Sequence, residues 1–229
     1  MGFVNRAKNV ATKTKNYFVH DKELIDAFNK QYFDTRVWQN RTHWFGTRIL
    51  KCPTDLWVYQ EMFHELQPDL VIETGTFNGG SALYMAHLMD IVGKGEIITI
   101  DIEKKDVFPE HPRITYHTAS SVAPETIAMV AEKVRGKKSV MVILDSDHSR
   151  DHVLQEMKLY HRFVSKGNYL IVEDSNLNGN PIHSELRHGP GPMEALHEFL
   201  QENSDFKIDK DREKFMVTFN PNGYLKRVQ

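Results

Sequence analysis

Four acidic residues stand directly after two apolar segments, where side chains could hold a metal ion. Asp145 and Asp147 follow 139–144, and Glu173 and Asp174 follow 169–172. The carboxyl ends of parallel strands meet at one edge of a sheet, so we expect these acids to be neighbours. Converging carboxylates repel one another unless a cation, protons or basic side chains neutralise them, and oxygen ligands suit Mg²⁺, Ca²⁺ or Mn²⁺. The pattern predicts a hard divalent cation; alternatively, one or two of the acids cap helices or pair with Lys51 or Arg187.

His148 lies in the same short segment as the first two acids. It is a candidate for proton transfer, or else it caps the helix expected to follow. A second histidine, His152, has the spacing of a metal-binding pair, but the residues between them lack the glutamate of H-E-x-x-H. We therefore interpret His152 as a surface residue of that helix.

A glycine turn follows an apolar run at 70–72 and leads into a helical pattern. Glycines permit a tight turn and a close approach of a ligand to the backbone, and a helix start offers free N–H groups. The spacing E-x-G-x-x-x-G-G differs from the dinucleotide fingerprint G-x-G-x-x-G, which argues against NAD or FAD. It resembles motif I of class I S-adenosylmethionine-dependent methyltransferases, although any strand–loop–helix turn can look similar. The candidate cofactor-binding residues of this turn are Glu73, Thr74, Gly75, Thr76, Gly79, Gly80 and Ser81.

Two further residues are candidates for contact with the cofactor. Asp101 ends the strand expected at 96–100, where an acid can accept hydrogen bonds from ribose hydroxyls. Ser120 follows the strand expected at 114–117, in a loop that usually runs beside the adenine in this fold. The alternatives are a helix-capping or surface aspartate at position 101 and a plain helix cap at position 120.

Apolar runs alternate with helical patterns along most of the chain, which predicts an α/β fold with a mostly parallel, doubly wound, Rossmann-like sheet. Short strands at 206–208 and 214–219 predict a C-terminal antiparallel hairpin on this sheet. We divide the chain into an N-terminal helical extension, 1–50, and a cofactor-binding domain, 51–229. The apolar positions between 21 and 50 could pack on the core or on another subunit, which leaves a homo-oligomer open.

The composition narrows the class of protein further. The chain has 229 residues and a net charge of −2, which gives no electrostatic reason to expect nucleic acid or a membrane surface as a partner. No apolar run approaches the length of a membrane span. The single cysteine, Cys52, excludes an intrachain disulfide and favours a reducing cytoplasm. We expect this thiol to be packed in the interior rather than nucleophilic.

The chain resembles the cephalosporin hydroxylase/rhamnosyl O-methyltransferase family. The matching stretches are K-C-P-T-D-L-W-V-Y-Q-E, L-V-I-E-T-G-T-F-N-G-G-S-A, V-I-L-D-S-D-H-S-R-D-H-V, L-I-V-E-D and G-Y-L-K-R-V. The resemblance implies a class I methyltransferase fold and, from related sugar O-methyltransferases, Mg²⁺. It maps the metal ligands to Asp145, Glu173 and Asp174, with Asp147 competing for the place of Asp145.

These observations favour an S-adenosylmethionine- and metal-dependent O-methyltransferase that acts on a hydroxyl of a small molecule or sugar. Asp145 and His148 are the candidate catalytic residues, with His148 accepting the proton. A second hypothesis is an iron oxygenase with a triad of His148, Asp145 and His183, which would leave the glycine turn without a role. A third is a binding module without catalysis, against which the four convergent acids argue.

Overall fold

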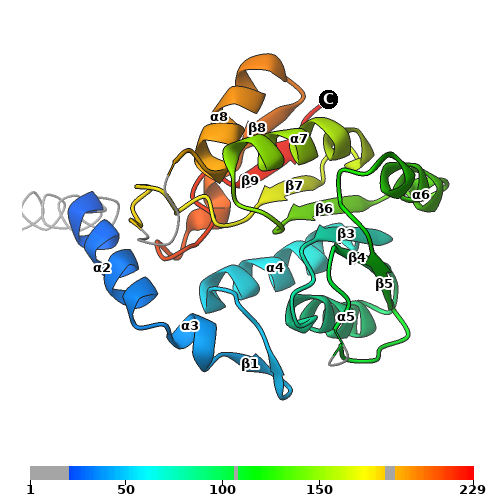
Figure 1. Ribbon diagram of the computed structural model, residues 1–229, viewed down its shortest axis with the longest axis horizontal. Coiled ribbons are helices and arrows are strands. Elements are labelled where there is room, and N and C mark those ends of the chain that lie inside the picture. The colour runs from blue at the N-terminus through cyan, green and yellow to red at the C-terminus, as the bar shows by residue number, and fades with distance from the viewer. Residues whose placement is uncertain (1–20, 106–107, 184–188) are drawn as a thin grey trace, which may run out of the picture.

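The apolar runs of the sequence become the strands of one central sheet. The computed structural model describes residues 21–105, 108–183 and 189–229, so the first 20 residues of the predicted extension lie outside the description, as does Arg187. Within the described residues, seven strands join in the order β5-β4-β3-β6-β7-β9-β8 (Figure 1). They are β3 (Leu70–Thr74), β4 (Glu96–Asp101), β5 (Ile114–Thr118), β6 (Val140–Leu144), β7 (Tyr169–Val172), β8 (Phe206–Ile208) and β9 (Tyr224–Arg227). All neighbours are parallel except at β9, which runs against both β7 and β8.

Helices cover both faces of this sheet, as a doubly wound fold requires. The elements outside the sheet are α2 (Lys22–Asp34), α3 (Val37–Asn40), β1 (His43–Trp44), β2 (Thr47–Arg48), α4 (Pro53–Leu66), α5 (Gly80–Val92), α6 (Pro124–Val134), α7 (Arg150–Tyr160), η1 (His161–Phe163), α8 (Pro192–Glu202) and η2 (Lys210–Glu213). Helices α4 and α5 lie on one face, and α6, α7 and α8 lie on the other. The predicted fold class is therefore confirmed.

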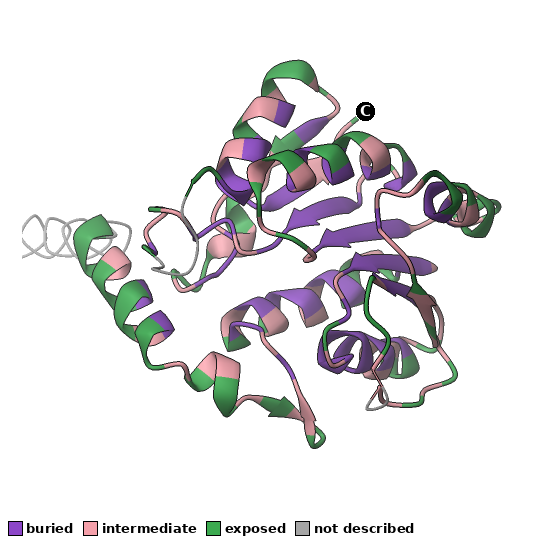
Figure 2. Cartoon of the chain, viewed as in Figure 1, coloured by how far each residue is buried: buried purple, intermediate pink, exposed green. Residues whose placement is uncertain are grey.

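The alternation of side chains along β3 divides the core into two layers. Leu70 and Ile72 pack with the cluster under α6, α7 and α8, whereas Val71 packs with the cluster under α4 and α5. All five residues of β3 are buried, as are all five of β6 beside it, because helices cover both faces of a parallel sheet. Figure 2 shows this buried centre with the exposed residues on the outer sides of the helices.

The predicted antiparallel hairpin forms, but its second strand lies later in the chain than expected. The prediction placed this strand at 214–219, and the structure places it at β9, with the short helix η2 before it. Residues 217–219 instead supply hydrogen bonds to the start of α4, through the carbonyl of Val217, the hydroxyl of Thr218 and the amide of Phe219. An apolar pattern alone does not distinguish these tertiary contacts from pairing within a sheet.

Asp55 is the buried acid that anchors this C-terminal segment. It is 2% exposed and accepts hydrogen bonds from Thr218 Oγ1 at 2.6 Å, Phe219 N at 2.8 Å and Tyr224 Oη at 2.9 Å. Burial and, to a smaller extent, the charge of Glu173 outweigh the lowering effect of these hydrogen bonds and raise the pKa of Asp55 to about 7. One carboxyl group thus ties the first turn of α4 to residues more than 160 positions later.

Replacing Asp55 with alanine should lower the free energy of unfolding by about 3 kcal/mol, because three buried donors would lose their acceptor. Urea unfolding followed by circular dichroism measures this loss. Asp90→Ala is the control, since it removes a surface carboxylate that pairs with Arg113, and it should change stability far less. Equal stability of the two variants would contradict the anchoring role of Asp55.

Candidate active site

The carboxyl edge of the parallel strands gathers three of the predicted chemical residues. One ligand atom from each of Asp145, His148 and Asp174 lies within 4.8 Å of the others. His148 Nε2 lies 2.7 Å from Asp174 Oδ2 and 3.6 Å from Asp145 Oδ1. Asp145 follows β6 and Asp174 follows β7 after one intervening residue, so the parallel pairing of these strands creates the group. The expectation that strand-end acids meet is confirmed for this pair.

His148 is held between these carboxylates inside the protein. Its side chain is 12% exposed, and neither ring nitrogen has a hydrogen bond of regular geometry within the described residues. Burial by itself would lower the pKa of His148, but the charges of Asp174 and Asp145 outweigh it and raise the pKa to about 9. Two carboxylate oxygens and an imidazole nitrogen with free bonding capacity suit either a proton or a cation.

The other two predicted metal ligands take different positions. Glu173 is 3% exposed, and its Oε1 accepts a hydrogen bond from Tyr59 Oη and pairs with Lys51 Nζ at 2.8 Å. Asp147 is exposed, and its Oδ1 accepts a hydrogen bond at 2.7 Å from the amide of Ser149, which precedes α7. Neither belongs to the three-residue group, and their roles as ligands stay predictions.

Lys51 joins the site from a segment outside the strand ends. Its Nζ lies 2.5 Å from Asp145 Oδ2, and its side chain is 5% exposed. Burial alone would lower the pKa of Lys51, but Asp145 and Glu173 hold it above its ordinary value. The same ion pair lowers the pKa of Asp145 against the effect of burial, while burial and Asp145 keep the pKa of Glu173 raised. The predicted alternative, pairing of an acid with Lys51, is thus realised for two acids.

The glycine turn between β3 and α5 lies beside this group. Gly75 has φ +90°, and a Cβ there would overlap the carbonyl oxygen of Asp145. A Cβ at Gly80 would overlap the carbonyl oxygen of Arg48, because the end of β2 lies against the start of α5. Both glycines therefore make room for backbone from other parts of the chain. The turn is fixed against Asp145 on one side and the N-terminal segment on the other.

The polar candidates of the turn are tied to neighbouring strands. Thr76 Oγ1 lies 2.7 Å from Thr99 Oγ1, and the Thr74 carbonyl accepts a hydrogen bond of 2.9 Å from the Asp145 amide. Gly79, with φ +75°, caps α5, whose first turn contains the buried Ser81. These contacts set the shape of the turn, and the cofactor contacts assigned to it stay predictions.

Asp101 holds the same turn from β4. Its Oδ2 accepts hydrogen bonds from the amides of Thr76 at 2.9 Å and Phe77 at 3.0 Å. Its Oδ1 accepts one from the amide of Glu103 at 3.0 Å. The carboxylate is thus engaged with backbone, and ribose binding by Asp101 stays a prediction. Ser120 lies after β5, and its carbonyl accepts a hydrogen bond of 3.2 Å from Ala123 at the start of α6.

His152 is more than the surface residue that the sequence suggested. Its Nε2 lies 3.3 Å from Ser121 Oγ and 3.4 Å from Glu156 Oε1. Glu156 is fully buried and also accepts a hydrogen bond of 2.8 Å from Ser146 Oγ. The face of α7 therefore links the loop after β5 to the loop after β6. The i, i+4 spacing of a histidine and a glutamate was the available signal for this contact.

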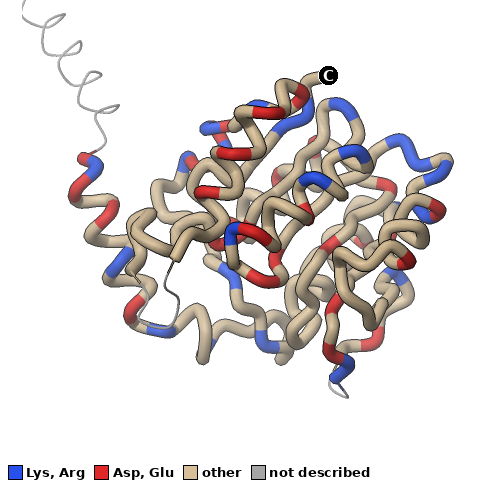
Figure 3. The backbone as a smooth tube through the Cα atoms, turned by 45° about the horizontal axis from the view of Figure 1, so that its top comes forward, with Lys and Arg blue, Asp and Glu red and all other residues tan. Residues whose placement is uncertain are grey.

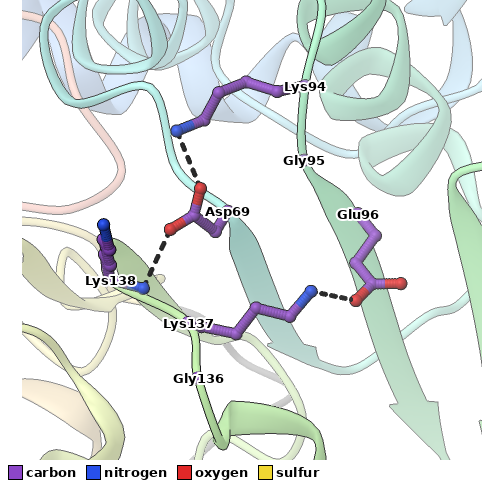
Figure 4. Close-up of a pocket in the computed structure, with 7 residues that line it drawn as sticks. All are labelled: Asp69, Lys94, Gly95, Glu96, Gly136, Lys137 and Lys138. Carbon is purple, nitrogen blue, oxygen red and sulfur yellow. Dashed lines mark hydrogen bonds and ion pairs between the residues drawn. The ribbon is translucent and has the colours of Figure 1, made fainter.

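A hollow at the opposite end of the sheet is separate from this chemistry. It measures about 650 Å³ and lies at the amino ends of β3, β4 and β6 (Figure 4). Lys94 pairs there with Asp69 at 2.7 Å, and Lys137 pairs with Glu96 at 2.7 Å.

Basic and acidic positions are interleaved along the described chain (Figure 3). Among the described residues, no helix has the length and apolar character needed to cross a bilayer.

The sheet order, with β9 reversed beside β7, and the glycine turn after β3 define the class I methyltransferase fold. Within this class, the chain belongs to the rhamnosyl O-methyltransferase/CmcI family, whose model matches residues 36–228. The family predicted from the sequence motifs, and with it the enzyme class of O-methyltransferase, is thereby confirmed.

Known relatives extend over nearly the whole chain. A rhamnosyl O-methyltransferase of Mycobacterium leprae is 42% identical over 214 residues, which cover 89% of this chain and 90% of the relative. The Mycobacterium tuberculosis rhamnosyl O-methyltransferase is 42% identical over 228 residues, covering 95% and 91%.

Solved structures agree with the fold. A CmcI structure with Mg and S-adenosylmethionine superposes with a TM-score of 0.63 at 25% identity, covering 82% of this chain and 77% of CmcI. The O-methyltransferase TomG of Streptomyces achromogenes, at 14% identity and a TM-score of 0.54, covers 100% of each chain and supports the fold alone.

The second hypothesis from the sequence, an iron oxygenase, finds no support in the geometry of the described residues. Within the described residues, the group of possible metal ligands consists of Asp145, His148 and Asp174, and His183 does not join it. An iron triad of two histidines and one carboxylate therefore has no counterpart there.

Glu73 lies beneath the site, fully buried, with Thr99 Oγ1 donating to its Oε2 at 2.7 Å. Burial raises the pKa of Glu73 to about 7, against the lowering effect of Lys51. Its Oε1 has no hydrogen-bond partner within the described residues. The side chain that the sequence assigned to cofactor binding is therefore enclosed by protein.

The raised pKa of Glu73 predicts a pH dependence of stability. The folded protein holds a proton that the unfolded chain, with a pKa of 4.5, has already released, so this group destabilises the fold as pH rises from 4.5 to about 7. Glu73→Gln removes that loss, and its melting temperature relative to the unmutated protein should rise between about pH 5 and about pH 8.

Glu65→Gln is the control for this experiment. Arg212 lowers the pKa of Glu65 below 4.5, so any stability gained from its ionisation is complete before the tested window begins. If both variants show the same dependence on pH, Glu73 does not titrate in this range.

Proposed function

We propose that the protein transfers the methyl group of S-adenosylmethionine to a hydroxyl of a sugar, with a divalent cation at the carboxyl edge of the sheet. The observation that carries this proposal is the group of Asp145, His148 and Asp174 beside the glycine turn of a class I methyltransferase fold. The relatives named rhamnosyl O-methyltransferase support a rhamnosyl or similar sugar as the acceptor.

The cofactor occupies the turn between β3 and α5 in this proposal. Class I topology places ligands outside the carboxyl ends of the strands, where the turn, Asp101 and Ser120 meet. The similar CmcI structure with S-adenosylmethionine supports this placement. Asp101 contributes by holding the amides of the turn in place, in addition to its predicted contact with ribose.

The residues present fit a hard divalent cation. Carboxylate oxygens of Asp145 and Asp174 converge, and the nitrogen between them has no regular hydrogen bond within the described residues. Asp145 and Asp174 would hold the ion, with Glu173 or Asp147 as the further predicted ligand. A bound Mg²⁺ would lower the pKa of the acceptor hydroxyl and help to fix its position.

The protein's own side chains supply the remaining chemistry. His148 accepts the proton of the acceptor hydroxyl when its ring is neutral, and Asp174 then stabilises the charged ring at 2.7 Å. The buried setting of His148 limits competing water. Rigid strand ends and the fixed turn position acceptor and donor for direct transfer of the methyl group.

Asp174→Asn should abolish methyl transfer while the affinity for S-adenosylhomocysteine stays within about twofold, because the cofactor contacts lie on other residues. Transfer to a rhamnoside, followed by mass spectrometry, and calorimetry with the cofactor product measure the two properties. Lys137→Met, at the opposite end of the sheet, should keep both. Full activity of Asp174→Asn, or activity that survives exhaustive chelation, would remove the metal from the mechanism.

The affinity for Mg²⁺ should rise with pH and level off above about 9. Without a bound cation, Asp174 and Asp145 favour the charged form of His148 and raise its pKa to about 9. The ring therefore carries a proton below about pH 9. A cation that takes these carboxylates must displace that proton, so binding weakens as pH falls. Magnesium calorimetry at several pH values, in two buffers of different ionisation enthalpy, detects the proton release. A pH-independent affinity with no released proton would contradict this coupling.

Location and assembly complete the proposal. We infer a cytoplasmic enzyme, supported by the buried, unpaired Cys52. The apolar side chains of Leu24 and Phe28 are 68% and 56% exposed on α2, which supports a contact with a second subunit.

A further inference from the structure

Lys51 is a buried positive charge that the methyl-transfer proposal does not use. It belongs to the segment between β2 and α4 and not to a strand end, and only 4% of the residue is exposed. Its Nζ pairs with Asp145 Oδ2 at 2.5 Å and Glu173 Oε1 at 2.8 Å. Burying an ammonium group is costly unless it is paired, so a lysine in this position is held by these two acids.

The two oxygens of Asp145 have different partners. Oδ2 pairs with Lys51, whereas Oδ1 is the oxygen 3.6 Å from His148 Nε2. In Glu173 a single oxygen, Oε1, contacts both Lys51 Nζ and the Tyr59 hydroxyl. Lys51 therefore occupies one oxygen of each carboxylate and leaves the other oxygen of each for a different partner.

The charge of the site follows from this pairing. Asp145, Glu173 and Asp174 carry three negative charges when ionised, and Lys51 offsets one of them. The remainder of two negative charges matches a single divalent cation when His148 is neutral. Without Lys51, the same three carboxylates would match a trivalent ion.

We propose that Lys51 is a positioning residue that sets the valence of the cation site: it offsets one negative charge of the strand-end acids and leaves Asp145 Oδ1 to face the ion. This inference rests on the proposed metal-dependent function, but it concerns cation binding and not methyl transfer. Support of ligating carboxylates by neighbouring charged groups is a general means of tuning a metal site.

A pair at the other end of the sheet offers a matched control. Lys94 pairs with Asp69 at 2.7 Å, close to the length of the Lys51 pairs, but its side chain is 43% exposed and lies at the amino ends of β3 and β4. Lys94→Met removes the same charge from the protein as Lys51→Met. A difference between the two variants therefore reports the position of the charge and not the net charge of the chain.

The test compares Ca²⁺ with Tb³⁺, ions of similar size and different charge, by calorimetry on the full chain without cofactor. Lys51→Met should raise the preference for Tb³⁺ over Ca²⁺ by at least about tenfold, because one more negative charge faces the ion. Lys51→Met/Glu173→Gln should return the preference to that of the unmutated protein, since the site again carries two negative charges. Lys94→Met should leave it unchanged.

The double variant also guards against a failure to fold. Lys51→Met leaves the carboxylates of Asp145 and Glu173 without their positive partner, so this variant should melt at a lower temperature. The double variant removes one of these two negative charges. An unchanged ion preference in a folded Lys51→Met protein, or a preference in the double variant that stays shifted, would overturn the inference. Binding of S-adenosylhomocysteine and methyl transfer are measured separately, so loss of the proposed function would be seen independently of ion preference.

Discussion

Repulsion between carboxylates at the ends of parallel strands is the constraint on which this structure depends. The α/β sheet brings Asp145, Glu173 and Asp174 to one edge, where low exposure strengthens every charge interaction. Lys51 on one side and His148 on the other offset this repulsion. Both cations sit against Asp145, which is consequently the acid whose pKa is lowered while that of Glu173 stays raised.

The surrounding framework keeps this charged group in place. Helix α4 begins five residues after Arg48, whose carbonyl lies against the start of α5, and the same helix carries Asp55 and Tyr59. Tyr59 donates to Glu173, and Asp55 receives the C-terminal segment. The first two turns of α4 therefore hold the C-terminal segment through Asp55 and reach the strand-end acids through Tyr59.

Sequence patterns were sufficient for the sheet, because its strands are continuous apolar runs and its acids fall at their ends. They predicted that Asp145 and Asp174 would meet, since parallel pairing of β6 and β7 leaves little alternative. The sequence patterns did not reveal that Lys51 would pair with Oε1 of Glu173. This pairing depends on side-chain contacts between segments that lie 122 residues apart in the chain. The second hairpin strand was misplaced for the same reason: Asp55 draws residues 218 and 219 out of sheet pairing.

The long reach of the Asp55 hydrogen bonds bears on the order in which the protein can be completed during synthesis. The start of α4 is synthesised more than 160 residues before Thr218, Phe219 and Tyr224, which donate to Asp55. Until they arrive, the buried acid lacks all three of its donors, and contacts of such sequence separation form slowly. A chain synthesised only as far as β7 has all five parallel strands and the glycine turn, but it still lacks β9 and the contacts that hold Asp55 at the start of α4.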